Sequence, residues 1–386
     1  MRIAIFAHSF ISDWNHGNAH FLRGIASELL ARGVEVLLFE PHDAWSLKNL
    51  SECYGEGPVK AFREYFPHLK INRYSLDTFD FNKELEGTDL IIVHEWNDHD
   101  LVARLGRYRN SERNCRILFH DTHHRSVTDP QSMSVYDLSN YDGVLAFGDV
   151  VKRIYEKNSW VERAYVWHEA ADARVFHPVA SHSLSGDLVW IGNWGDDERS
   201  AELREYLFDP VKDLGIRCRV HGVRFPAAAL GELQESGIKY GGWIPNYRVP
   251  VLFSRFRLTV HIPRRPYVEK LVGIPTIRPF EALACGIPLI CSPWEDSEGL
   301  FTPGEDFLMA ADGKEMTEHI RMVLNDEEFA RQMAERGRNT VLRRHTCAHR
   351  VNELFDICRD LGIVSDRFRF DETVSSVNRN EHRNNC

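Results

Sequence analysis

The chain has 386 residues, a formal net charge of −10, 43% hydrophobic residues and 27% charged residues. This length exceeds one ordinary core and predicts two domains of roughly 150–180 residues each. The acidic balance argues against a general nucleic-acid-binding protein, which normally carries a basic excess. It does not exclude nucleotide binding, because a few local arginines and a helix terminus suffice for two phosphates.

Cysteine usage and hydropathy indicate the compartment. Eight cysteines are scattered along the chain without a Cys-x-x-Cys pair, which favours free thiols in a reducing cytosol. No apolar run approaches the ~20 residues that span a bilayer. Segment 1–7 is apolar, but it is too short for a signal peptide and runs into a polar loop. We therefore expect a cytoplasmic protein without a transmembrane segment.

The first half of the chain alternates strand and helix patterns. Apolar residues between Leu22 and Leu30 recur at helical spacing, and Gly33 ends that helix. Because strands separated by helices pair in parallel through right-handed crossovers, this half predicts a doubly wound sheet. The expected strands are 3–7, 34–39, 90–93, 117–120, 144–147 and 165–167.

The pattern restarts after segment 178–186, where Pro, Ser and His replace apolar periodicity. The second half then repeats strand and helix signals, so we expect an α/β protein of two Rossmann-like parallel-sheet domains facing across a cleft. The expected strands here are 188–191, 218–221, 258–262 and 289–291, with helices at 199–208, about 250, before 289 and within 314–360. The predicted parts are a first domain at 1–180, a second at 181–345, a helix at 346–365 that crosses back to the first, and a disordered tail at 366–386.

Segment 278–291 predicts a short helix that feeds into a buried strand. Pro279 suits the first helical position, and Gly286 supplies a left-handed stop. Free N–H groups and the positive dipole end attract an anion at the helix start, where Arg278 adds a full charge. Glu281, one turn in, can accept from sugar hydroxyls. The segment can thus hold a nucleoside diphosphate; the alternative is a helix cap with solvated Arg and Glu.

This segment resembles the nucleotide-sugar site of GT-B glycosyltransferases, most closely their spore-maturation (CgeB-like) branch. The resemblance covers most of residues 1–360 and includes segments 172–178, 300–306 and 343–350. It implies a GT-B fold and a hexosyltransferase that needs no cofactor. It also implies that the second domain binds a nucleoside diphosphate sugar, with UDP favoured. The first domain would present a glycan, small-molecule or protein acceptor.

A polar loop follows the first strand, at the sheet edge where open α/β sheets bind ligands. In it, Asp13, His16 and His20 are each chemically able to accept a proton from an acceptor hydroxyl. Each could equally be a loop or capping residue. Asn18 is suited to cap the helix that follows. The resemblance implies that this loop faces the acceptor and the transferred sugar. Its expected acceptor-side contacts are Trp14, Gly17 and Asn18.

A second polar run, His120 to Arg125, directly follows the strand at 117–120. His120 and His123 stand three apart, as metal ligands can, but no distant partners complete a zinc site, so we expect no metal. The resemblance implies that His120 lies against the donor sugar hydroxyls and that Asp121 orients it or acts as a base. Segment 94–96 is a weaker candidate for lining the same cleft.

Two loops of the second domain are candidates for donor binding. Gly192 and Asn193 lie in a turn between a strand and a helix, where backbone N–H groups can approach a phosphate. Such turns are also commonplace without that role. The resemblance implies that this turn lies near the diphosphate and that Trp243 and Ile244 contact the nucleobase. For Trp243 the alternative is a turn with a packed indole.

Cations between the strand ending at 262 and the phosphate helix are candidates for stabilising a diphosphate leaving group. We expect at least one of Arg264, Arg265 and Lys270 to reach the diphosphate, with Arg264 and Lys270 as the favoured contacts, and the others to be solvated.

One position departs from the resemblance. Many retaining relatives carry a second glutamate eight positions before the one that matches Glu281, and this chain has Gly273 there. We favour retention, in which the leaving phosphate accepts the proton and no strong base is needed. Inversion would require a base from Asp13, His16, His20 or Asp121.

The alternatives to a glycosyltransferase are a nucleotide-sugar epimerase of the same fold and a non-catalytic binding or assembly protein.

Overall fold

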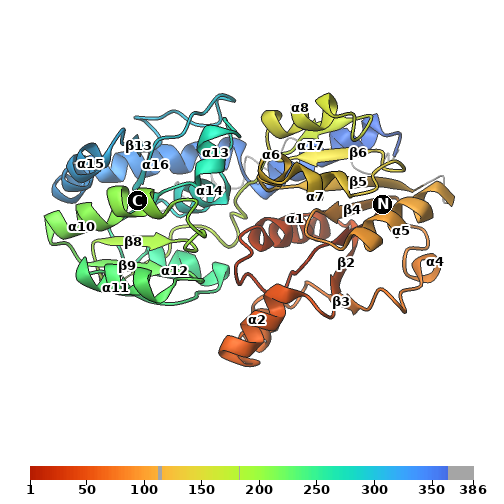
Figure 1. The fold of residues 1–386 in the computed structure, drawn as a ribbon, viewed down its shortest axis with the longest axis horizontal. Helices are drawn as coiled ribbons and strands as arrows, with labels where there is room; N and C mark the ends of the chain where they lie inside the picture. Colours follow the sequence, from red (N-terminus) through yellow and green to blue (C-terminus); the bar gives the residue numbers. More distant parts are fainter. Residues whose placement is uncertain (112–114, 182, 364–386) are drawn as a thin grey trace, which may run out of the picture.

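The computed structural model describes residues 1–111, 115–181 and 183–363. Two α/β units lie side by side, one on each side of a central interface (Figure 1). The first sheet has the order β3-β2-β1-β4-β5-β6-β7, and the second has the order β10-β9-β8-β11-β12-β13. Neighbouring strands are parallel in both sheets. The predicted pair of doubly wound sheets is confirmed.

The first unit contains every first-domain strand that the sequence predicted, and one more at its edge. β3 escaped prediction because its sequence Ile-Asn-Arg-Tyr is short and half polar. The strands are β1 (Arg2–Phe6), β2 (Glu35–Pro41), β3 (Ile71–Tyr74), β4 (Leu90–His94), β5 (Arg116–Asp121), β6 (Gly143–Ala146) and β7 (Ala164–Val166). The helices are α1 (Ala19–Ala31), α2 (Trp45–Tyr54), α3 (Gly57–Tyr65), α4 (Phe81–Glu84), α5 (His99–Ser111), α6 (Arg125–Thr128), α7 (Pro130–Ser134) and α8 (Asp149–Lys157).

The second unit repeats this arrangement with shorter strands. The strands are β8 (Leu188–Ile191), β9 (Cys218–His221), β10 (Lys239–Tyr240), β11 (Leu258–His261), β12 (Leu289–Cys291) and β13 (Leu308–Met309). The helices are α9 (Ser200–Leu203), α10 (Asp209–Leu214), α11 (Ala227–Glu235), α12 (Val249–Phe253), α13 (Arg265–Glu269), α14 (Ile277–Ala284), α15 (Gly313–Asn325), α16 (Glu327–Arg344) and α17 (Cys347–Asp360). A π-helical turn, Arg204–Phe208, joins α9 to α10, and a 3₁₀ turn, Asn246–Arg248, precedes α12.

Helices cover both faces of the first sheet, which explains its continuous apolar strands. In β4, Leu90 and Ile92 belong to one apolar cluster, and Ile91 and Val93 belong to another. Alternate side chains of a strand point to opposite faces, so each face has its own core. Parallel strands buried in this way read as unbroken apolar runs, and this made them visible in the sequence.

The last helix of the described chain, α17, packs against the first unit although α16 belongs to the second. Arg32 of α1 donates from Nη2 to the carbonyl of Ala348 (3.0 Å), and the Trp167 indole N–H donates to the carbonyl of Arg350 (2.8 Å). Leu354 has no exposed surface. The chain therefore passes from the first unit to the second and returns. The prediction for residues 366–386 lies outside the described residues.

In residues 1–111, 115–181 and 183–363, no helix is both long and apolar enough to cross a bilayer. The cysteines found there are free thiols, and most of them are buried.

Leu354→Ala tests whether α17 is part of the first unit's core. Removing a fully buried leucine side chain leaves a cavity and costs about 2–5 kcal/mol of unfolding free energy. Urea denaturation followed by circular dichroism measures the loss. Met322→Ala on α15, where the side chain is 39% exposed, is the control. Equal stabilities of the two variants would show that α17 is not packed as described.

Candidate active site

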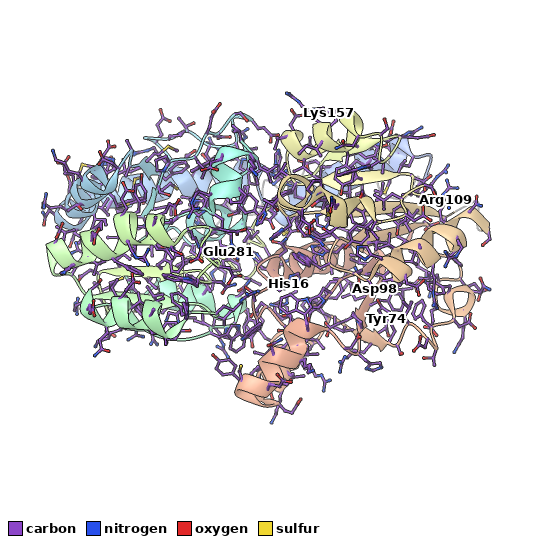
Figure 2. All side chains as sticks on the ribbon, viewed as in Figure 1. His16, Tyr74, Asp98, Arg109, Lys157 and Glu281 are labelled. Atoms are coloured by element: carbon purple, nitrogen blue, oxygen red, sulfur yellow. The ribbon has the colours of Figure 1, made fainter. Side chains whose placement is uncertain are left out.

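A cavity of about 540 Å³ opens where the two units meet. In Figure 2, His16 of the first unit lies at this junction. Both sheets direct the carboxyl ends of their strands toward it, as ligand sites of open α/β sheets do. First-unit loops after β1, β4 and β5 form one wall. The other wall is formed by second-unit loops after β8, β9, β10 and β11 and by the start of α14.

The start of α14 faces the cavity with unsatisfied backbone donors. Thr276, Ile277 and Arg278 line the cavity, and Thr276 makes no side-chain cap to the helix. Uncapped N–H groups and the positive dipole end favour an anion at this position. The helix begins two residues before Pro279, which is buried and lies outside the cavity lining. Gly286 ends the helix with φ +66°, the left-handed stop that the sequence predicts.

Three guanidinium groups from different segments meet beside this helix start. Arg199, Arg264 and Arg278 all line the cavity. Arg264 pairs with Glu198 (3.0 Å), and Arg278 pairs with Glu281. Arg199 donates to two backbone carbonyl oxygens. The arginines thus bring three positive charges to a site with two carboxylate partners.

Burial and the neighbouring positive charges both change the titration of groups in this site. Burial, followed by the charges of Arg264 and Arg278, lowers the pKa of Arg199 to about 9. Burial, followed by Arg199 and Arg278, lowers the pKa of His261 to about 3. Like charges destabilise one another when crowded, so an anion bound between these arginines would relieve the repulsion.

The turn after β8 lies beside these arginines. A Cβ added to Gly192 would lie 2.6 Å from the Trp190 ring. Gly195 has φ +90°, and a Cβ added there would lie 3.1 Å from Arg199 Nε. The absence of side chains lets the backbone and Arg199 share this space. Asn193 donates to the Asn15 side chain across the interface (2.6 Å). Gly192 and Asn193 line the cavity; their contact with a phosphate stays a prediction.

The carboxylate of Asp13 joins the two units. It accepts hydrogen bonds from the Trp243 indole (3.0 Å) and the Asn246 backbone N–H (3.0 Å), and it pairs with Arg23 (2.9 Å). Its oxygens are therefore already engaged, although Asp13 lines the cavity. In this structure Asp13 is an interdomain hydrogen-bond acceptor, and its role as a base stays a prediction. Trp243 and Ile244 line the cavity, and their contact with the nucleobase stays a prediction.

His20 and Glu281 form a second buried link between the units. His20 Nε2 accepts the backbone N–H of Asp172 (3.0 Å), so the proton of the neutral ring lies on Nδ1, which faces Glu281 Oε1 at 2.7 Å. Arg278 binds the other oxygen. Glu281 has no exposed surface and lies outside the cavity lining. His20 and Glu281 thus form a buried network that contacts Arg278. The roles of His20 as base and of Glu281 on the ribose stay predictions.

His120 lies beneath the cavity. Its side chain has no exposed surface, and its ring packs against Trp167 (5.0 Å between centroids), His94 (5.4 Å) and Phe21 (5.8 Å). Neither ring nitrogen has a partner among the described residues. The predicted contact with the donor sugar is corrected, because neighbouring rings cover this imidazole.

Asp121 is also buried. It accepts from the Tyr155 hydroxyl (2.9 Å) and the His123 backbone N–H (3.1 Å). Burial, followed by the charge of Glu95, raises the pKa of Asp121 well above its ordinary value. A carboxyl group closed off in this way cannot reach a substrate, so its predicted role as base is corrected to a structural one.

His16, like Asp13, is a predicted base that lines the cavity. Its Nε2 is buried and is without a hydrogen-bond partner in the described part of the chain. Burial, followed by His8 and Arg23, lowers the pKa of His16 to about 3. The ring is therefore neutral near pH 7 and can accept a hydrogen bond.

The other loop predictions divide. Gly17 lines the cavity, and a Cβ added to it would lie 3.7 Å from the Ile277 side chain. Asn18 also lines it, but its side chain donates to Thr122 and does not cap α1, which corrects that expectation. Trp14 lies outside the lining and packs edge-on against Trp45 (6.3 Å).

Neighbouring cations after β11 have different positions. Arg264 points into the cavity, whereas Arg265 pairs with Glu202 (2.7 Å) on the outside. Lys270 is exposed and lies outside the cavity lining, so its predicted donor contact is corrected. It directly follows α13 (Arg265–Glu269).

Two histidines of the 120–125 segment do reach the cavity. His123 and His124 line it, with ring centroids 3.9 Å apart. Trp96 of the weaker 94–96 candidate lines it as well, while Glu95 is buried in an ion pair with Arg125 (2.9 Å). In residues 1–111, 115–181 and 183–363, no group of three or more His, Cys, Asp or Glu is arranged to hold a metal ion.

Several cavity residues escaped the sequence analysis, notably Arg199, Thr122 and Asn246. Arg199 stands in an ordinary charged run at a helix start, and nothing in its spacing separates it from solvated arginines. His261 had a usable signal, because it is a polar residue at the carboxyl end of a buried strand.

Gly273 has no room for a side chain. Its φ is +101°, and a Cβ there would collide with the Ser297 hydroxyl. Glu298 lies next to the same position and pairs with His168 (3.1 Å). The departure at residue 273 is therefore built into the surrounding fold.

Comparisons with known proteins agree with this architecture. A family model described as "Glycosyl transferase-like" matches residues 199–356. No curated protein sequence matches the chain.

Similar solved structures span nearly the whole chain. Sucrose-phosphate synthase from Thermosynechococcus elongatus has a TM-score of 0.66 at 17% identity and covers 95% of this chain and 100% of its own. Anabaena HepE in complex with UDP and glucose has 0.63 at 13%, covering 94% and 100%. An α-glucosyltransferase in complex with UDP and a 13-mer DNA has 0.65 at 12%, covering 93% and 100%. The GT-B fold expected from the sequence is confirmed.

A row of buried histidines underlies the first-unit wall of the cavity. Ring centroids are 5.8 Å apart from His8 to His16, 5.7 Å from His16 to His94 and 5.4 Å from His94 to His120. Burial is the main cause that lowers the pKa of His8 to about 4, those of His16 and His120 to about 3, and that of His94 well below 6.5.

This row predicts acid sensitivity, which His120→Leu tests. The unfolded chain binds protons as pH falls through 6.5, but folded His120 binds one only near pH 3. The stability from its depressed pKa is thus full above pH 6.5 and is lost as pH falls toward 3. Each such histidine contributes a slope of about 1.4 kcal/mol per pH unit within that window.

Urea denaturation of wild type and His120→Leu between pH 7 and pH 5 measures the difference. On acidification below pH 6.5, the unfolding free energy of the variant should fall less steeply than that of the wild type, by about 1.4 kcal/mol per pH unit. Parallel pH profiles for the two proteins would contradict a neutral, buried His120.

Proposed function

We propose that this protein is a glycosyltransferase that moves a sugar from a nucleoside diphosphate sugar, with UDP favoured, to a hydroxyl-bearing acceptor. The observation that carries the proposal is the convergence of Arg199, Arg264 and Arg278 on the uncapped start of α14. The glycosyl transferase-like family match over 199–356 includes these positions. Structures of the same fold in complex with UDP support uracil as the nucleobase of the donor.

The chemistry follows from the charge distribution. The bond between the anomeric carbon and the β-phosphate oxygen breaks, and the acceptor oxygen forms a new bond to that carbon. Negative charge develops on the departing diphosphate, where preorganised cations and helix dipoles lower the barrier. The three arginines supply this stabilisation, in a reaction that we propose to be independent of a metal. Trp243 and Ile244 line the part of the cavity assigned to the base.

The acceptor's proton has two routes. In retention, which we favour, it passes to the leaving phosphate, and no strong enzymic base is required. In inversion it passes to a base, and His16 is the cavity-lining member of the predicted set with an unpartnered nitrogen in the described chain. Membership of the CgeB-like branch and hexosyl transfer stay predictions.

Glu281 and His20 act in this proposal as positioning residues. His20 fixes one carboxylate oxygen of Glu281, and the other oxygen holds Arg278 toward the cavity. Because the same network ties the first unit to the second, domain closure and phosphate binding are coupled.

Arg264→Ala tests the donor site, and Arg265→Ala is its matched control. Arg264 lines the cavity, whereas its neighbour pairs with Glu202 outside it. Loss of a charge-assisted hydrogen bond costs about 1.5–3 kcal/mol, so the dissociation constant for UDP should rise roughly 10- to 150-fold in Arg264→Ala. Calorimetric titration measures it. Equal UDP affinities in the two variants would refute the assigned phosphate site.

Turnover distinguishes the proposed activity from its alternatives. The protein is incubated with UDP-glucose, UDP-galactose and UDP-N-acetylglucosamine, with and without a mixture of glycan acceptors, and products are followed by mass spectrometry. Transfer predicts acceptor-dependent UDP release with a mass increase of the acceptor. A new sugar nucleotide from donor alone would indicate an epimerase. Binding without any turnover would indicate a non-catalytic protein.

A further inference from the structure

A second cavity, of about 640 Å³, adjoins the first at the carboxyl end of the first sheet. It lies among residues after β1, β2, β3 and β4, and Figure 2 shows its members Tyr74 and Asp98 in the first unit, on the far side of His16 from Glu281. Trp45 and Trp96 line both cavities. Its volume is within the range of about 300–1,000 Å³ that small-molecule sites occupy.

Aromatic rings form much of its wall. Trp45 and Trp96 are half-buried, and Tyr74 and Tyr136 are buried at the base. Trp45 stacks on His8 (4.7 Å, 27°), and the Arg125 guanidinium lies 4.1 Å from the Trp96 ring. These contacts fix the orientation of both indoles. A rigid aromatic surface with an apolar face and a polar edge suits the C–H faces of a sugar ring.

Fixed polar groups accompany the rings. His8 Nε2 accepts the Ser46 backbone N–H (3.1 Å), so the neutral ring carries its proton on Nδ1. The side-chain amide of Asn97 donates to the carbonyls of Phe6 (2.9 Å) and His94 (2.7 Å). Its Oδ1 lacks a hydrogen-bond partner in the described ranges. These hydrogen bonds hold both side chains in fixed orientations, and the unpaired Asn97 Oδ1 is itself buried.

The charge of this cavity is opposite to that of the first. Asp43, Asp77 and Asp98 line it and are exposed. In the described part of the chain, the carboxylates of Asp43 and Asp77 make no hydrogen bond or ion pair. The lining cation Arg125 is already paired with Glu95 (2.9 Å). The negative field also acts on Tyr74: burial, followed by Asp43 and Asp98, raises its pKa.

We infer that this second cavity binds the acceptor, and that the acceptor is a neutral or amine-bearing carbohydrate that carries no negative charge. The inference rests on the proposed transfer function. The acceptor ring lies against Trp45 and Trp96, and its reactive hydroxyl passes between them into the donor cavity beside His16. Asp43 and Asp77 bind ring hydroxyls or an ammonium group and repel carboxylates and phosphates.

This charge pattern separates the two substrates. The diphosphate is drawn to the arginines of the second unit and repelled by the aspartates of the first, so the donor enters in one orientation. The same aspartates disfavour nucleic acid as an acceptor, because its phosphates would face unpaired carboxylates at short range.

Saturation-transfer NMR with three related sugars tests the inference. D-glucose, D-glucosamine and D-glucuronate share a polyhydroxylated ring and differ in charge. With UDP present, the wild-type protein should transfer saturation to glucose and more strongly to glucosamine, but not to glucuronate. Trp45→Ala should abolish transfer to glucose, whereas Trp160→Ala, at a half-buried indole outside the cavity, should retain it.

The charge component is tested separately with the double variant Asp43→Asn/Asp77→Asn. Both side chains are exposed, so the fold should tolerate the change. The preference for glucosamine over glucuronate should fall by about 3- to 10-fold, while Glu162→Gln, at an exposed carboxylate elsewhere, should leave the preference intact.

Calorimetric binding of UDP keeps the two proposals distinguishable. If the wild type does not bind UDP, the donor site is refuted. If the double variant binds UDP as the wild type does, its changed sugar preference arises from the acceptor site. The acceptor inference is overturned if UDP binds but glucuronate binds as well as glucosamine, if none of the sugars binds, or if Trp45→Ala leaves the glucose signal unchanged.

Discussion

Repulsion among Arg199, Arg264 and Arg278 is the constraint on which the site depends. These three guanidinium groups line one cavity, and burial, followed by the charges of Arg264 and Arg278, lowers the pKa of Arg199. Backbone carbonyls hold Arg199 in place, and the buried Glu281 holds Arg278. A bound anion would offset the repulsion among the three charges.

Hydrogen bonds across the interface between the two units also shape the cavity. Asp13 accepts from Trp243 and Asn246, and His20 donates to Glu281. These hydrogen bonds join residues separated by more than 200 positions in the sequence. They hold the cavity walls together and connect the loop after β10, the helix α14 and the loop after β1. The proposed glycosyl transfer would benefit from this connection, because closure excludes the water that would hydrolyse the donor.

The sequence was informative where burial is uniform and local. Strands covered on both faces, such as β4, are continuous apolar runs, and the helix stop at Gly286 follows from backbone geometry alone. Edge elements such as β3 and β10 lacked that pattern because they are short and partly exposed. The helix α14, with Arg278 in its first turn, was predicted because a helix start has a recognisable local signature.

The roles of individual polar residues were harder to predict, since they depend on the partner that the fold supplies. Asp13, His20 and Glu281 have side chains suited to substrate contact, yet each meets a partner from a distant segment. Arg264 and Arg265 are adjacent, and only the start of α13 decides which faces the cavity. Arg199 gave no signal because its environment is created entirely by tertiary structure.

A crystal structure of the protein with UDP tests the central claim most directly. It should show the diphosphate at the start of α14, with oxygens within hydrogen-bonding distance of Arg278 and of at least one of Arg199 and Arg264. Electron density for UDP elsewhere on the molecule, with the arginines still directed toward an empty cavity, would contradict the claim.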